Sequence, residues 1–249
     1  MIRRRVLHRA LLALGALLVP LAPAAAQGLT VDLGLGDAST TARIVELVAL
    51  LTVLSLAPGI LVMVTSFTRI VIVLSFLRSA LGIQQTPPNV VLVSLALFLT
   101  GFIMAPTLQQ SYDDGIAPLI NEEIDYQQAF DKAVAPVHAF MRSQVREQDL
   151  ALFMEMSPEK QVATPEDTPL SALIPAFMIS ELRRAFEIGF LLFIPFLIID
   201  MVVASILMSL GMMMLPPVMI SLPFKLIFFV LVDGWYLVAG SLMRSFGLG

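Results

Sequence analysis

Apolar residues gather in four tracts along the chain, at residues 44–81, 90–105, 185–210 and 218–242. The tracts form two pairs, and a polar segment, residues 107–180, separates one pair from the other. Tracts of this length and apolarity are typical of helices that lie in a membrane or are buried on all sides. The pattern predicts an all-α protein built of membrane-associated helical hairpins, with a helical extracytoplasmic middle segment between them.

The two apolar pairs share one design of turn. One pattern occurs at residues 81–88 and again at residues 210–217: Leu-Gly, then four residues, then Pro-Pro. Glycine is common just past the end of a helix, and proline is common at the start of one. Each turn is therefore predicted to join two helices in a hairpin. The turn residues are Gly82, Pro87, Pro88, Gly211, Pro216 and Pro217.

The N-terminal residues have the features of a cleavable signal peptide. Arg3, Arg4 and Arg5 precede an apolar run, and three alanines at residues 24–26 offer a small-residue cleavage site. A twin-arginine signal and an uncleaved anchor helix are the alternatives. The predicted domains are a signal peptide at 1–26, a first apolar hairpin at 27–106, an acidic helical periplasmic segment at 107–180, and a second apolar hairpin with a Met-rich tip at 181–249.

Charge distribution predicts the topology. Acidic side chains outnumber basic ones in the middle segment, whereas Arg69 and Arg78 lie near the turn of the first hairpin. Lysine and arginine favour the cytoplasmic side of a membrane, so the middle segment is expected outside the cytoplasm. Within that segment, the Asn-Glu-Glu sequence at residues 121–123 predicts a helix N-terminus, and Pro136 predicts the start of a second helix.

Charged side chains interrupt the apolar tracts, although ionised groups at membrane depth are costly and usually face a partner or water. They include Glu46, Arg69 and Asp200. We expect these helices to pack mostly against protein, with limited lipid contact. Lys225 has three candidate partners, which are Asp233, an acidic residue of another protein and a lipid headgroup. The charges expected to be buried or to bridge subunits are Arg146, Glu181, Arg183, Arg184, Glu187, Lys225 and Asp233.

Two kinds of pairing are open to the charges around residue 181. Glu181 with Arg184, and Arg183 with Glu187, have the spacing of neighbours on one helix face. The alternative is a bridge between subunits from the middle segment to Glu181. The candidates for that bridge are Arg142 and Arg146.

Three adjacent methionines, Met212, Met213 and Met214, occupy the second turn. A turn that faced only water would not favour three thioethers, whereas methionine is unbranched and polarisable and repacks easily. We expect these residues to form a deformable gasket around a pore, because a hydrophobic constriction blocks water and ions by dewetting. The alternative is that they fill space at the end of a buried helix.

Composition narrows the classes of function. The chain is 58% hydrophobic and 14% charged, with a mean hydropathy of +0.89, which indicates an integral membrane protein or a membrane-derived assembly. It has no cysteine and only two histidines, of which His8 lies in the predicted signal peptide. Thiolate metal sites and histidine-based catalysis therefore lack their ligands. No enzyme activity, cofactor, metal or nucleic-acid partner is expected.

Several longer motifs resemble one family. Residues 175–190, Pro-Ala-Phe-Met-Ile-Ser-Glu-Leu-Arg-Arg-Ala-Phe-Glu-Ile-Gly-Phe, are similar to the signature of the FliP family of flagellar export-gate proteins. So are residues 222–226, Leu-Pro-Phe-Lys-Leu, and residues 231–235, Leu-Val-Asp-Gly-Trp. Shorter matches extend the resemblance over nearly the whole chain after the signal peptide, at residues 67–70, 74–78 and 84–89.

The resemblance implies a core channel subunit of the flagellar type III protein export gate. It places the protein in the bacterial inner membrane and on its periplasmic side, within the flagellar basal body. It also implies a ring-forming homo-oligomer, pentameric as in the family, that assembles with the FliQ and FliR proteins and contacts FlhB. The implied cargo is unfolded flagellar proteins, and much of the family's assembly lies outside the usual plane of the bilayer.

Three other readings of the function stay open. The homologous gate subunit of virulence type III secretion injectisomes shares much of the C-terminal half, although the signal peptide and the acidic middle segment favour the flagellar member. An assembly scaffold without a pore of its own is the second. A secondary transporter is the third, since such carriers contain paired hairpins and intramembrane charges, but the turns lack an evident ion or substrate site.

Overall fold

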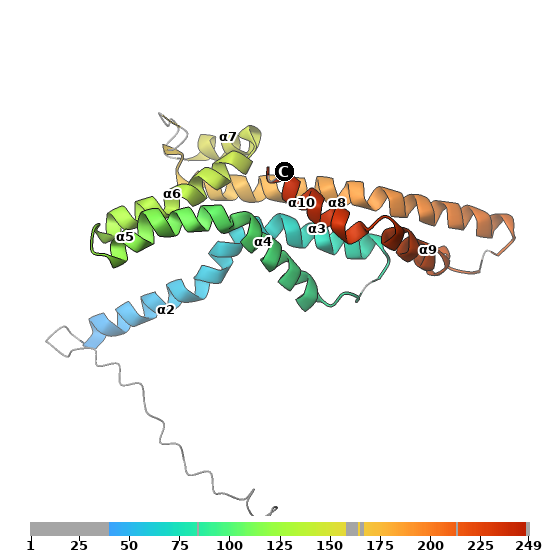
Figure 1. Cartoon of the computed structure of the whole chain (residues 1–249), viewed down its shortest axis with the longest axis horizontal. Helices are drawn as coiled ribbons and strands as arrows, with labels where there is room; N and C mark the ends of the chain where they lie inside the picture. The colour runs from blue at the N-terminus through green and yellow to red at the C-terminus, as the bar shows by residue number, and fades with distance from the viewer. Residues whose placement is uncertain (1–39, 84, 158–163, 165–166, 213, 248–249) are drawn as a thin grey trace, which may run out of the picture. The chain divides into compact units, whose positions relative to one another are not determined.

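The structure is a computed structural model that describes residues 40–83, 85–157, 164, 167–212 and 214–247. All regular secondary structure in these ranges is helical (Figure 1), which confirms the prediction of an all-α protein. The predicted signal peptide, residues 1–26, and Met213 lie outside the described residues. The chain forms two units, residues 1–52 and residues 53–249.

The described part of the first unit is the N-terminal portion of α2 (Thr40–Met63). Within it the hydroxyl of Thr52 donates a hydrogen bond to the backbone oxygen of Val48, 2.7 Å away, so this polar side chain is satisfied inside its own helix. The apolar side chains of Leu50 and Leu51 are 61% and 63% exposed.

The second unit is built around the packing of α3 (Phe67–Ala80) along α8 (Leu170–Ser209) (Figure 1). Gly189 of α8 permits this close approach, because a Cβ atom there would lie 2.6 Å from the ring of Phe76. The apolar side chains of α3 recur at helical spacing on the face that α8 covers. Those that are at most 1% exposed are Ile70, Val73, Leu74, Leu77 and Ala80.

Both Leu-Gly turns end a helix in the same way. Gly82 follows α3 with a φ of 78°, and Gly211 follows α8 with a φ of 75°, a left-handed conformation that glycine adopts without steric cost. After these turns, α4 (Asn89–Ser111) begins next to Pro88, and α9 (Pro217–Leu231) begins next to Pro216. Since α3 packs against α4 and α8 against α9, each turn closes a helical hairpin.

The middle segment is helical, but two of its predicted helix boundaries are wrong. Its elements are η1 (Tyr112–Ile116), α5 (Ala117–Ile120), α6 (Tyr126–Gln144) and α7 (Glu147–Met156). The N-cap of α6 is Asp125, whose carboxylate accepts a hydrogen bond over 2.8 Å from the backbone amide of Gln128, and not residues 121–123. Pro136 is buried inside α6, where packing of the residues on both sides overrides the local preference of proline for a helix start.

The remaining features of the second unit are the length of α8 and the bend after α9. The helix α8 runs unbroken for 40 residues and crosses the boundary that the sequence predicted between residues 180 and 181. The helices α9 and α10 (Gly234–Arg244) meet at a bend of 63°.

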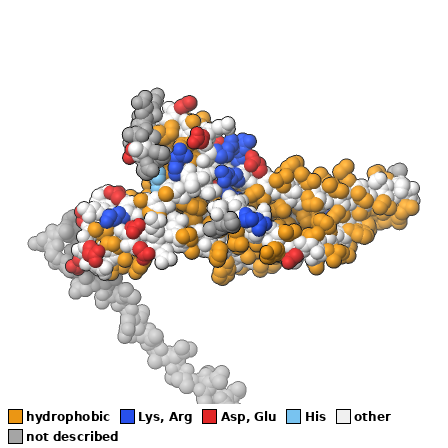
Figure 2. Space-filling model, turned by 45° about the horizontal axis from the view of Figure 1, so that its top comes forward, with side chains coloured by type: hydrophobic (Ala, Val, Ile, Leu, Met, Phe, Trp, Pro, Cys, Tyr) orange, Lys and Arg blue, Asp and Glu red, His pale blue; other side chains and the backbone are white. Residues whose placement is uncertain are grey.

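By length and composition, the described part of the chain has three stretches able to cross a membrane, or four if the bent pair counts as one span. The three are Ile44–Met63, Asn89–Ile120 and Leu170–Ser209. In Figure 2, hydrophobic side chains cover the end of the second unit that holds the α8–α9 turn, and most of the visible charged side chains gather over its other end.

Candidate functional site

Arg69 of α3 and Glu181 of α8 form a fully buried ion pair. The Nε atom of Arg69 donates a hydrogen bond to Oε2 of Glu181 over 2.8 Å, and Nη2 of Arg69 donates to Oε1. Two parallel bonds between a guanidinium and a carboxylate fix the relative orientation of both groups. Burial lowers the pKa of the Arg69 guanidinium from its ordinary value, and the hydrogen bond and charge of Glu181 oppose that change.

The remaining donors of Arg69 bind two further segments. Nη2 also donates to Oε1 of Gln144 in α6 over 3.1 Å, and Nη1 donates to the backbone oxygen and the hydroxyl of Ser245, over 3.0 Å and 2.9 Å. The ring of Phe246 lies 3.6 Å from the guanidinium carbon, within the range of a cation–π contact. These five residues, which we call the guanidinium hub, join α3, α6, α8 and the chain just after α10.

Lys225 of α9 is a second buried charge, 3% exposed. Its Nζ atom lies 2.6 Å from Oδ2 of Asp200 in α8 and donates to the backbone oxygen of Ala80 over 3.1 Å. The hydroxyl of Ser221 donates to the other oxygen of Asp200. Lys225 thus joins α9 to α8 and to the C-terminal end of α3. Asp233, one of the three partners considered from the sequence, is exposed and precedes α10 with a φ of 49°.

The other charges singled out from the sequence lie on the N-terminal half of α8 or next to it. Arg183 and Glu187 form an i, i+4 pair over 2.9 Å, and both side chains are 58% exposed. Arg184 donates to Gln144 over 3.1 Å, and the backbone amide of Arg146 donates to the hydroxyl of Ser180 in α8 over 3.0 Å. Because Arg69 binds both oxygens of Glu181, the structure pairs Glu181 within its own chain; a bridge between subunits stays a prediction.

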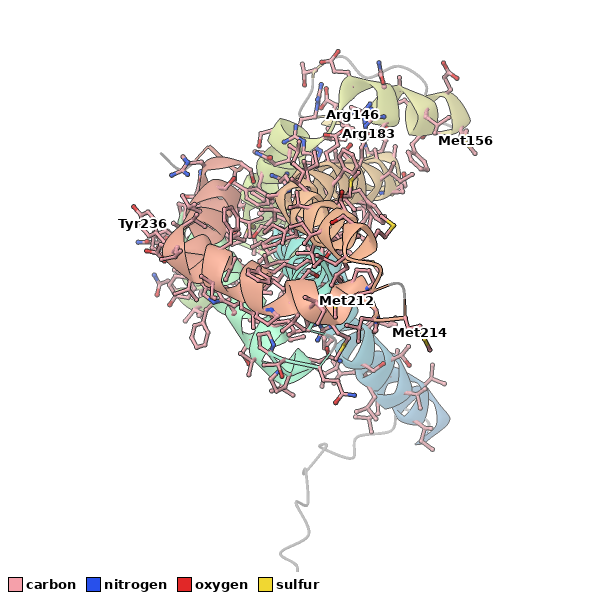
Figure 3. The ribbon with its side chains drawn as sticks, turned by 90° about the vertical axis from the view of Figure 1, so that its right-hand side faces the viewer. Arg146, Met156, Arg183, Met212, Met214 and Tyr236 are labelled. Atoms are coloured by element: carbon pink, nitrogen blue, oxygen red, sulfur yellow. The ribbon has the colours of Figure 1, made fainter. Side chains whose placement is uncertain are left out.

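The α8–α9 turn carries its described methionines on the surface. Met214 is 98% exposed and Met212 is 46% exposed, and in Figure 3 Met214 stands at the outer edge of the turn. Leu210 and Leu215 beside them are 67% and 41% exposed. Neither described methionine fills space in the interior of the chain. An exposed apolar patch of this kind marks a surface that contacts another molecule.

Sequence reasoning missed most partners of the buried charges. Arg69 and Glu181 are 112 positions apart, and Arg69 and Ser245 are 176 apart, so no local spacing connects them. Asp200 and Lys225 are different, because they precede and follow the turn of one predicted hairpin and such a fold brings them face to face. Among the residues described, no cluster of histidine, aspartate or glutamate has the arrangement of a metal site.

Comparison with known proteins identifies the family. The profile of the FliP family matches residues 50–242, a range that contains α3, α8 and the α8–α9 turn. The chain belongs to the FliP family. This membership confirms the resemblance seen in the motifs and assigns the chain to flagellar biosynthesis, as a component of the export apparatus.

The FliP relatives match over most of their length. A flagellar biosynthetic protein FliP from Caulobacter vibrioides is 59% identical over 248 residues, which cover 100% of this chain and 93% of that protein. The Bacillus subtilis protein of the same name is 57% identical over 84% of this chain and 95% of its own length. The Aquifex aeolicus protein of that name is 49% identical over 87% of this chain and 91% of its own length.

Proposed function

We propose that this chain is a channel subunit of the flagellar type III export gate, in which several copies form a ring that unfolded flagellar proteins cross. Family membership and the flagellar names of the relatives support the process, and helices long enough to cross a membrane support a location in the inner membrane. A pentameric ring, the partners FliQ, FliR and FlhB, and a position on the periplasmic side of the basal body belong to the same proposal.

The observation that carries this proposal is the exposed Met-rich tip of the second hairpin. Met214 contacts almost nothing of its own chain, and Met212 is 46% exposed, so the exposed parts of these side chains lack an apolar environment unless another molecule supplies one. Copies arranged around a symmetry axis bring identical surfaces together. A ring of such tips forms a hydrophobic constriction that stays closed to water and ions, and the flexible side chains repack around a passing polypeptide.

The scaffold behind the tip suits this role. The tip is attached to α8, a continuous helix of 40 residues, and Lys225 ties the returning helix α9 to Asp200 of α8 over 2.6 Å. The guanidinium hub fixes α8 to α3 and α6 closer to its N-terminal end. Rigid helices therefore hold the tip in place, while adaptable side chains make the seal.

Replacing Met212, Met213 and Met214 by alanine tests the proposed gasket. The shorter side chains widen the resting constriction, so we expect a higher ion conductance of the purified assembly in planar bilayers, with export of flagellar proteins retained. The matched control replaces three exposed methionines elsewhere in the second hairpin, Met201, Met208 and Met219, which are 65%, 59% and 66% exposed. An unchanged conductance in the tip variant, or an equal rise in the control, refutes the gasket.

The same experiment separates the alternatives. A scaffold without a pore predicts no conductance from either the wild type or the tip variant, and a closed centre in a map of the assembled particle. An injectisome subunit predicts that the chain restores secretion in an injectisome mutant and not swimming in a flagellar mutant. The flagellar names of the relatives favour the restoration of swimming.

A further inference from the structure

The bend between α9 and α10 borders a partly open apolar cavity of about 230 Å³. Residues of four helices line it, and every described lining residue has an apolar side chain or is glycine. The helices on its two sides meet at 63°. The residues that define its walls include Leu77, Leu192, Phe196, Phe229, Val232 and Val238.

The cavity follows from how the helices break. The helix α9 ends at Leu231, and Asp233, with a left-handed φ of 49°, lies at the bend before α10 begins. Gly234 then passes directly against the ring of Phe229, because a Cβ atom at this position would lie 2.1 Å from that ring. Since the bend turns α10 away from the axis of α9, the two helices do not fill the angle between them.

Aromatic contacts hold the walls open. The ring of Phe229 lies 6.3 Å from the ring of Phe196, and 5.4 Å from the ring of Trp235 in an edge-to-face arrangement. Phe196 also contacts Phe228 edge to face, at 6.2 Å. Edge-to-face pairs favour fixed orientations of the rings, so these side chains do not simply collapse into the space beside them.

The chemistry of the lining selects a hydrocarbon ligand. A closed apolar cavity of about 150 Å³ lined by aliphatic and aromatic side chains binds small hydrocarbons. The cavity here has the same kind of lining and about 230 Å³ of space, and its partly open side admits a chain that enters from the surface. A ligand with a charge or a hydrogen-bonding group would find no partner among the described side chains of the lining. An unbranched alkyl chain, which changes shape by rotation about its single bonds, suits an irregular space of this kind.

The surroundings of the cavity point to the source of that alkyl chain. Next to the break, Val230, Leu231 and Tyr236 are 75%, 79% and 71% exposed, and Trp235 is 43% exposed. Exposed aliphatic side chains together with tryptophan and tyrosine are typical of the boundary between lipid tails and headgroups. We propose that the cavity at the α9–α10 bend binds one acyl chain of a membrane phospholipid. This site does not depend on the export function.

Trp235 makes the proposal measurable, because it is the only tryptophan of the chain and contacts a wall of the cavity. A phospholipid with vicinal bromine atoms in one acyl chain is titrated into the full-length protein in detergent micelles, against the same lipid without bromine. A bound acyl chain brings the bromine atoms close to the indole. The expected result is quenching of Trp235 fluorescence that saturates at a low fraction of brominated lipid, in addition to a linear component from random collisions.

Variants that fill the cavity decide the outcome. Val238→Phe is expected to lose the saturable quenching, and Leu192→Phe provides a second filler if the first variant loses helicity by circular dichroism. Val230→Phe on the exposed face of α9 is the matched control and keeps the saturable component. Linear quenching alone in the wild type overturns the proposal and indicates that protein, such as a second copy, fills the cavity; saturable quenching that survives in a folded filler variant overturns it as well.

Discussion

Replacing Glu181 by glutamine tests how the guanidinium hub stabilises the protein. The substitution keeps the size of the side chain and removes the negative charge that Arg69 binds through two hydrogen bonds. Both side chains of the pair are 0% exposed, and arginine stays charged in proteins. The variant therefore leaves a buried cation without its counter-ion.

The expected loss follows from the contacts that survive. Removal of one partner of a buried ion pair costs about 3–5 kcal/mol. Gln144, Ser245 and the ring of Phe246 still contact the guanidinium, so we expect the lower end, about 3 kcal/mol. The double variant Arg69→Met with Glu181→Leu has no unpaired charge. Its loss of unfolding free energy should therefore be smaller, by at least about 2 kcal/mol, than the summed losses of the single variants Arg69→Met and Glu181→Leu.

Denaturant titration of the purified protein in detergent, followed by the fluorescence of Trp235, gives the free energy of unfolding for each variant. Glu187→Gln is the matched control, because Glu187 lies on the same helix and its side chain is 58% exposed in the pair with Arg183. The control should change the stability by only a few tenths of a kcal/mol, about the value of a solvated helix pair. A Glu181→Gln variant as stable as the control, or strictly additive single changes, would refute the reasoning.

Two further substitution sets address α9 and the turns. Asp200→Asn leaves Lys225, which is 3% exposed, as a buried cation without its counter-ion and should reduce the free energy of unfolding by about 3 kcal/mol. Lys225→Met should cost less, because the remaining charge on Asp200 is 23% exposed and still accepts a hydrogen bond from Ser221; equal losses in the same titration would contradict this. Gly211→Ala should destabilise the protein by about 1–2 kcal/mol, since Gly211 has a φ of 75°. By contrast, Gly101→Ala within α4, where a Cβ atom meets nothing within 4 Å, should stabilise the protein by about 0.5–1 kcal/mol. A higher thermal unfolding midpoint for Gly211→Ala than for Gly101→Ala would show that a side chain at residue 211 does not strain the turn.

Much of the fold could be predicted because its signals are local. The apolar tracts, the Leu-Gly helix ends and the prolines that start the outgoing helices lie within a few residues of the structures that they specify. Gly82 and Gly211 adopt positive φ angles, as expected of residues that end helices. The position of the Met-rich sequence at the hairpin tip follows from the same turn signal.

The guanidinium hub could not be predicted because its residues meet only when the helices pack. Arg69 was recognised as a charge in an apolar tract, but Gln144, Ser245 and Phe246 carry no pattern that sets them apart from other residues of their segments. The prediction of where α6 begins was wrong for a related reason. An acidic sequence at residues 121–123 has the composition of a helix N-terminus, yet the Asp125 side chain makes the capping hydrogen bond to Gln128.

Because the ligands of Arg69 are far from it in the sequence, the order of synthesis determines when they can bind it. Its guanidinium binds Ser245, which the ribosome adds 176 residues later. A nascent chain interrupted before this point has an arginine that lacks several of its ligands, and it should be recognised by proteases as an incomplete product. The guanidinium therefore gains its full set of ligands only after the ribosome has added every helix that the hub joins.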